Sequence, residues 1–157
     1  MSIGNGVPYF ATGLRLDGSI EEGDVVWQNQ TVSTTINANA ACLYASGYVS
    51  SNTTTFAATF AGVALFGQTI TTPTAAIAII KPNPNKYFWI PVGSATLITQ
   101  AAVGTLCDFD SSGQKINLTA NSPTAYGMQV VDFDASTLAV AANAAGYAKV
   151  RIIAASE

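Results

Sequence analysis

The distribution of β-forming residues is the feature that most constrains the fold of this chain. Short runs rich in Val, Ile, Thr, Phe and Tyr are separated by Gly, Pro, Asn, Asp and Ser, and no window has the sustained 3.6-residue periodicity of an amphipathic helix. In KVRIIA, Val150 and Ile152 alternate with Lys149 and Arg151, as in a half-buried strand. This pattern predicts an all-β fold, either a compact β-barrel or a β-sandwich.

Strands are expected wherever such a run is long enough to pair. The predicted strands cover residues 8–16, 24–28, 31–36, 41–49, 56–66, 75–81, 87–91, 106–110, 114–119, 125–133 and 146–154. Residues 94–104 have the N-cap and glycine stop of a single helical turn. The alanine-rich residues 135–146 interrupt a strand pair, which favours a loop or hairpin there.

The first 18 residues differ in character from the rest. They combine glycines with isolated apolar residues, which is typical of a segment that orders only against something else. We therefore predict an extended N-terminal arm over residues 1–18 and a barrel or sandwich domain over residues 19–157. The apolar residues expected to anchor the arm on a partner are Val7, Tyr9, Phe10, Leu14 and Leu16.

The composition indicates a surface that is largely covered by partners. Of the 157 residues, 49% are hydrophobic, only 10% are charged and none is His, whereas soluble domains carry roughly 25% charged residues. The alternative is a stable β domain whose surface consists of Ser, Thr, Asn and Gln. A net charge of −3 and scattered basic residues argue against binding to nucleic acid or to an anionic membrane.

The N-terminus lacks the charged start and apolar core of a signal peptide, and the longest apolar stretch, TAAIAIIKP, is too short to span a bilayer. We expect a chain that is made in a cytosol and then kept soluble or assembled. Cys42 and Cys107 lie in apolar, strand-like contexts and are expected to be small buried hydrophobes. Whether the two cysteines pair stays open.

The segment CDFDSSG (107–113) has the spacing that opens an EF-hand calcium loop. The expected ninth and twelfth ligand positions are Ile116 and Thr119, so the closing carboxylate is missing, and the flanks alternate like strands. A hairpin turn explains the same residues, and we predict a turn and no metal. A second Asp-Phe-Asp triplet, in VDFDAST (131–137), is interpreted as a solvated strand end; the alternative is a cation site shared with the first triplet.

Catalysis is not expected, and no cofactor is predicted. Without His the chain lacks the usual general base near neutral pH and every His-dependent triad or metal site. The carboxylates that remain are not arranged as a recognisable pair, and no Gly-rich phosphate loop is present.

The aromatic residues in KYFWIP (86–91) offer a test for sugar binding. Tyr87 and Trp89 alternate with Phe88 and so share one strand face, which could form a two-ring platform for a sugar. Core packing or contact with another subunit is the alternative use of such rings. We therefore name Tyr87 and Trp89 as candidate partner-binding residues.

Several segments in order along the chain resemble a family of viral proteins. EEGDVV, GVALFGQTI, FWIPVGSATLITQAAVGTLCDFDSSGQKINL, YGMQVVDFD and AKVRII resemble the small β-barrel decoration (head cement) proteins of tailed bacteriophages over roughly residues 20–155. The resemblance implies a non-enzymatic protein that sits on the capsid surface, binds the major capsid protein and bridges neighbouring subunits, often as a homo-trimer or other homo-oligomer. It also implies that residues 1–18 form the arm that reaches across the shell.

Two other functions stay open at this stage. One is a carbohydrate-binding β module on a virion surface, and the other is a tail-tube or other structural virion protein. All three place the mature chain in a virion after synthesis in the host cytoplasm.

Overall fold

In the computed structural model the chain is all-β, as predicted, and its strands pair antiparallel. The structure describes residues 10, 12–53, 59–71, 75–93, 97–119, 126–135 and 145–154. The elements, in chain order, are β1 (Arg15–Asp17), β2 (Val25–Asn29), β3 (Thr34–Ile36), β4 (Ala41–Ala45), β5 (Tyr48–Ser51), β6 (Phe60–Ala64), β7 (Gln68–Ile70), β8 (Ala76–Ile80), β9 (Tyr87–Pro91), the 3-10 helix η1 (Gln100–Ala102), β10 (Leu106–Phe109), β11 (Ile116–Asn117), β12 (Tyr126–Asp134) and β13 (Tyr147–Ala154).

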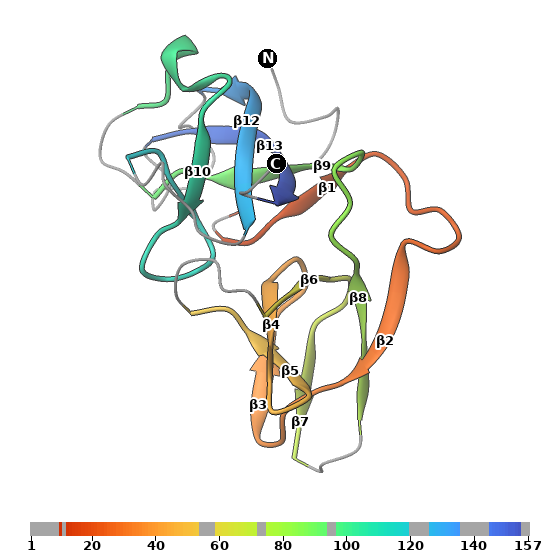
Figure 1. The fold of residues 1–157 in the computed structure, drawn as a ribbon. Helices are drawn as coiled ribbons and strands as arrows, with labels where there is room; N and C mark the ends of the chain where they lie inside the picture. Colours follow the sequence, from red (N-terminus) through yellow and green to blue (C-terminus); the bar gives the residue numbers. More distant parts are fainter. Residues whose placement is uncertain are drawn as a thin grey trace.

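The strands form two lobes, one above the other in Figure 1. The terminal lobe is a six-stranded sheet in the order β1-β9-β13-β12-β10-β11. A bridge from Val92 to Ile116 joins the end of β9 to β11, so five of these strands curl toward a small barrel. Its interior is filled by alternating apolar side chains such as Phe88, Met128 and Val150.

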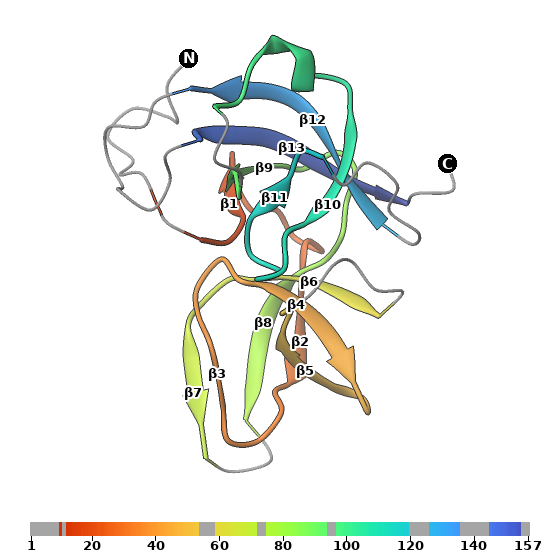
Figure 2. The same cartoon turned by 90° about the vertical axis from the view of Figure 1, so that its left-hand side faces the viewer.

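The central lobe contains β2 to β8 and is inserted between β1 and β9 (Figure 2). Five of its strands form a sheet in the order β2-β8-β6-β4-β5, and β3 pairs with β7. A bridge between Gln30 and Val49 brings the two edges of the sheet together at one end, so this sheet also curls. Cys42, Ile77 and Ile79 pack inside it.

A continuous apolar core joins the lobes. Phe60 of the central lobe packs against Tyr126 and Phe109 of the terminal lobe, with ring centroids 5.6 Å and 6.4 Å apart. Ala41, Val63 and Ile80, also from the central lobe, belong to the same buried cluster as the interior of the terminal lobe. Because the lobes share this core, they are parts of one packed structure.

Several predicted strands are longer than the observed ones, β7 was not predicted, and the predictions at 41–49 and 8–16 differ most from the structure. Residues 41–49 form a hairpin and not one strand, because Ser46 and Gly47 have positive φ values of 51° and 83° and make a tight turn between β4 and β5. The strand predicted at 8–16 begins only at Arg15, where β1 pairs with β9. Residues 94–104 contain the 3-10 turn η1, whose N-cap is Thr99. The predicted N-cap, Ser94, and most of the loop predicted at 135–146 lie outside the described residues. Among the described residues, no helix is long and apolar enough to cross a membrane.

Candidate interaction surface

The central lobe carries no charged residue. The 56 residues from Val25 to Ile80 contain no Asp, Glu, Lys, Arg or His, so all 6 basic and 9 acidic residues lie in the terminal lobe, the connections or the C-terminus. Neutral hydrogen bonds serve its polar groups instead: the buried Gln30 amide donates to the backbone carbonyls of Thr34 and Gln68 at 2.9 Å and 3.3 Å. A surface without charged side chains is typical of the centre of a permanent protein–protein interface.

Large apolar side chains are exposed on the same lobe. Trp27 on β2 and Phe66 after β6 are 64% and 58% exposed, and Tyr48 and Val32 are also open to solvent. Ile20 and Leu97 are the other exposed large apolar side chains among the described residues, and they lie outside this lobe. The uncharged, apolar-rich central lobe is therefore the candidate interaction surface.

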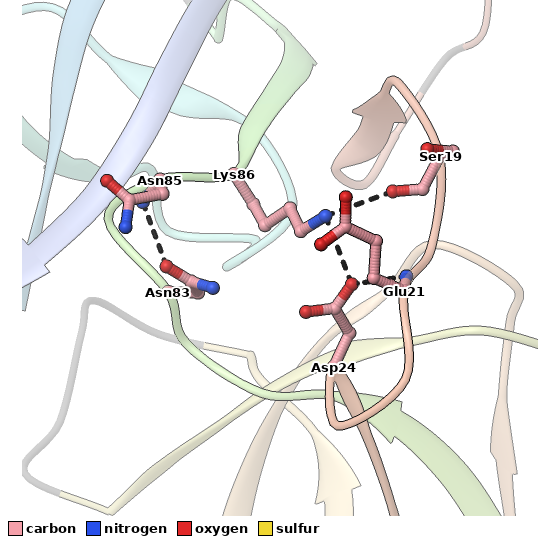
Figure 3. A network of polar contacts seen from close by, with 6 residues as sticks. All are labelled: Ser19, Glu21, Asp24, Asn83, Asn85 and Lys86. Carbon is pink, nitrogen blue, oxygen red and sulfur yellow. Dashed lines mark hydrogen bonds and ion pairs between the residues drawn. The ribbon is translucent and has the colours of Figure 1, made fainter.

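Charges gather where the chain passes between the lobes. Lys86 places its Nζ 3.0 Å from the Oδ2 of Asp24 and donates to the backbone carbonyl of Ser19 at 3.1 Å (Figure 3). The backbone N–H of Glu21 also donates to Asp24, and these two contacts hold the pKa of the Asp24 carboxyl below its ordinary value of 3.8. The two connections are thus tied together at the border of the uncharged lobe.

The CDFDSSG segment is a hairpin turn between β10 and β11, as predicted. Asp110 accepts hydrogen bonds from the backbone N–H and the hydroxyl of Ser112, and the Gly113 N–H donates to the Asp110 carbonyl. The oxygens that suggested calcium thus hold the turn. Among the described residues, no three His, Cys, Asp or Glu side chains are grouped closely enough to hold a metal ion.

The same turn docks the terminal lobe onto the central lobe. The Gln114 amide donates to the carbonyls of Ala41 and Asn52 at 3.0 Å and 2.8 Å and accepts from the Ala41 N–H at 2.9 Å. A Cβ added to Gly113 would lie 2.5 Å from the Asn52 carbonyl oxygen, so only glycine fits at this approach. The sequence motif therefore marks a contact between the lobes.

The Tyr87 and Trp89 rings share a strand face, but that face is covered. Trp89 is 3% exposed and clusters with Tyr147 and Phe10, and Lys149 lies 5.5 Å and 6.0 Å from the centroids of Tyr87 and Trp89. Trp89 offers no open face on which a sugar could stack.

The described part of the predicted arm is packed into the terminal lobe. Leu14 is fully buried in the core, and Leu16 on β1 lies against it. Phe10 packs on Tyr147 at a centroid distance of 5.3 Å, and its carbonyl accepts a hydrogen bond from the Tyr147 hydroxyl. Of the proposed anchors, Val7 and Tyr9 lie outside the described residues. An arm that leaves the fold can therefore comprise only residues before Phe10.

The remaining candidates have structural places. Cys42 and Cys107 are free and buried in different clusters, and burial raises the pKa of the Cys42 thiol to about 12 and raises that of Cys107. In the second acidic triplet, Asp132 accepts a hydrogen bond from the Phe133 N–H, and Asp134 is buried instead of solvated at a strand end.

No protein-family model matches the sequence, and no curated protein matches it significantly. The resemblance to head cement proteins therefore rests on the quoted segments. The absence of charge between Asp24 and Lys81 is visible in the sequence and was the signal that could have located the central lobe in advance.

Proposed function

We propose that the protein is a non-enzymatic capsid decoration protein, which binds the major capsid protein on the outer shell and bridges neighbouring subunits. The observation that carries the proposal is the uncharged central lobe with its exposed Trp27 and Phe66. In this proposal the central lobe faces the shell and the charged terminal lobe faces solvent. The resemblance of the quoted segments to head cement proteins supports the same role.

Clamping a shell needs buried area and shared hydrogen bonds but no proton transfer. Permanent interfaces are more hydrophobic than transient ones, and their centres are depleted in charge. Copies held on one shell also gain from multivalency, because each further contact forms at a high effective concentration. A chain without His and with a charge-free lobe suits these requirements.

The two other functions receive unequal support. A sugar-binding module would need the Trp89 ring, which Phe10 and Tyr147 cover. A tail-tube or other structural virion protein is supported by the same exposed apolar lobe, since a tube subunit also makes permanent contacts. Polymerisation of the purified chain in isolation would favour the tube protein.

The decisive experiment is co-sedimentation with empty capsid shells that lack the protein. We expect saturable binding and a higher melting temperature of the shells in calorimetry. Phe66→Lys, which places a charge on the central lobe, should weaken binding at least tenfold. Ala101→Lys places the same charge at an exposed position of η1 in the terminal lobe and should bind like the wild type. No saturable binding, or equal loss in both variants, contradicts the proposal.

We also propose that the protein acts as a homo-trimer or other homo-oligomer at a symmetry point of the shell. Light scattering over a tenfold range of concentration gives the solution mass. A constant mass of three chains supports the trimer, and a constant mass of one chain contradicts a preformed oligomer.

A further inference from the structure

The outer edge of β2 presents backbone groups that no strand of the described chain pairs with. β2 pairs with β8 in a register that sets Val25 opposite Ile80. The Lys81 N–H donates to the Asp24 carbonyl, and the Gln30 N–H donates to the Ala75 carbonyl, so the even-numbered residues form the bonds to β8. The N–H and C=O groups of Val25, Trp27 and Asn29 consequently point away from β8.

The other edge of the sheet closes only the far end of β2. Thr31, the next odd-numbered residue, donates its N–H to the Val49 carbonyl of β5 at 2.8 Å. The bridge between Gln30 and Val49 lies at the same level. In a parallel bridge of this kind the Val49 N–H donates to the Asn29 carbonyl, so the pairing with β5 reaches Asn29, and no described strand continues it along Val25–Gln28. The curled sheet lacks one strand at the end nearer the terminal lobe.

An apolar groove of about 390 Å³ lies beside this edge. It is lined on one side by Val26 and Gln28 of β2 and on the other by Tyr44, Phe60 and Tyr126. A second hollow, of about 210 Å³, is also lined by Tyr126 and extends to the end of β13 at Ala154. An extended segment beside β2 could thus direct every second side chain into an apolar channel.

The groove has one charged lining residue, Lys81, at the Val25 end of β2. Lys81 is exposed, and among the described residues no carboxylate lies within ion-pair distance of it. The neighbouring carboxylate of Asp24 is already paired with Lys86. β2 itself carries no charged side chain of the kind that usually blocks pairing of an exposed strand, and the charges beside it, Asp24 and Lys81, lie only at its Val25 end.

We propose that β2 accepts an extended segment of the capsid subunit as an additional strand, with apolar side chains in the groove and an acidic side chain opposite Lys81. The inference rests on the proposed function and specifies how the partner is held. Main-chain hydrogen bonds to Val25, Trp27 and the Asn29 N–H provide the register, and the groove selects the alternate side chains. The added strand also covers part of the exposed Trp27 ring.

Proline substitution tests the edge without touching the pairing with β8. Asn29→Pro removes an outward N–H and places a ring where the added strand would lie, while Asn29→Ala keeps the N–H. Both variants should melt within a few degrees of the wild type. In co-sedimentation with empty shells, we expect Asn29→Pro to lose at least tenfold in affinity and Asn29→Ala to bind normally. Lys81→Glu should weaken binding, and Lys81→Arg should not.

Hydrogen exchange provides the second readout. The amides of Val25, Trp27 and Asn29 should exchange more slowly in the shell-bound protein than in the free protein. If the wild type binds shells and Asn29→Pro binds equally well, or if these amides stay unprotected, the edge inference is overturned while the decoration role survives. If the wild type does not bind shells, both the decoration role and the edge inference are overturned. Protection that depends on protein concentration without shells would show that a second copy occupies the edge, which also overturns the inference.

Discussion

Replacing Gln114 should uncouple the two lobes at their polar contact. The Gln114 amide makes three hydrogen bonds to the central lobe, two as donor to the carbonyls of Ala41 and Asn52 and one as acceptor from the Ala41 N–H. Ala41 is fully buried, so removing the Gln114 side chain takes away the hydrogen-bond partner of a buried N–H. The Ala41 carbonyl keeps a second donor, the Asn52 N–H at 2.8 Å.

The expected cost of Gln114→Ala follows from these bonds. Leaving a buried donor without its partner costs about 1–3 kcal/mol, and the bond to the Asn52 carbonyl contributes about 1 kcal/mol net. The bond to the Ala41 carbonyl is not counted, because that oxygen keeps the Asn52 N–H. We therefore expect the free energy of unfolding to fall by about 2–4 kcal/mol, a large part of the roughly 5–15 kcal/mol typical of a domain. With a urea m-value of about 2 kcal/mol/M, the middle of the usual range, the urea midpoint should fall by about 1–2 M.

Urea unfolding followed by fluorescence of the buried Trp89 measures this change. Gln100→Ala, at an exposed position of η1, is the matched control and should change stability by less than about 0.5 kcal/mol. Gln114→Glu should destabilise as much as Gln114→Ala at neutral pH, because a carboxylate oxygen would face two carbonyls, and it should recover on protonation at low pH. A Gln114→Ala loss below 0.5 kcal/mol, or a stable Gln114→Glu at neutral pH, would refute this reasoning.

Three further predictions concern the core and the turn. Burial raises the pKa of the Cys42 thiol from 9.0 to about 12, so the stabilisation of the folded state by the neutral thiol is complete below pH 9 and is lost between pH 9 and 12. Between pH 8 and pH 10 the free energy of unfolding of the wild type, measured in urea, should therefore fall by about 1.4 kcal/mol more than that of Cys42→Ala. Equal pH slopes would contradict this. Gly113→Ala should lower the free energy of unfolding by at least about 2 kcal/mol more than Gly104→Ala. Both glycines have positive φ, but only at Gly113 would the added Cβ clash with the Asn52 carbonyl. Equal losses of stability in thermal melts would count against this close approach. Deleting residues 1–18 removes the buried Leu14 and β1, and should lower the free energy of unfolding, followed by circular dichroism, by more than about 3 kcal/mol. Deleting residues 1–9 keeps every contact described and is the control. A fully stable 1–18 deletion would show that β1 is dispensable.

The two-lobe architecture suggests a division of labour within the proposed function. The terminal lobe carries charged side chains, including the ion pair between Lys149 and Asp17 at 2.7 Å, and suits a solvent-facing surface. The central lobe presents neutral polar groups and exposed rings. Since the lobes share one core through Phe60, a force on the bound lobe is transmitted to the other through packed side chains.

The fold class could be read from the sequence because it depends on local patterns. Alternation in KVRIIA marks Val150 and Ile152 as inward residues, and both are buried in β13. The Asp and Gly residues of CDFDSSG mark a turn because they favour the backbone angles of tight connections. Local chemistry of this kind acts within a few residues and needs no knowledge of the rest of the chain.

Pairing between distant segments was decided by the tertiary structure. Sequence could not place Gln114 against Ala41, or Phe10 over Tyr147, because such contacts depend on which strands become neighbours when the sheets curl. For the same reason Leu14 and Trp89, which resemble surface anchors when considered one by one, are buried. The open edge of β2 likewise exists only because β5 ends its pairing at Val49. The hydrophobicity of Leu14 and Trp89 determined that their side chains would be covered, and the packing of the strands determined that other parts of the same chain cover them.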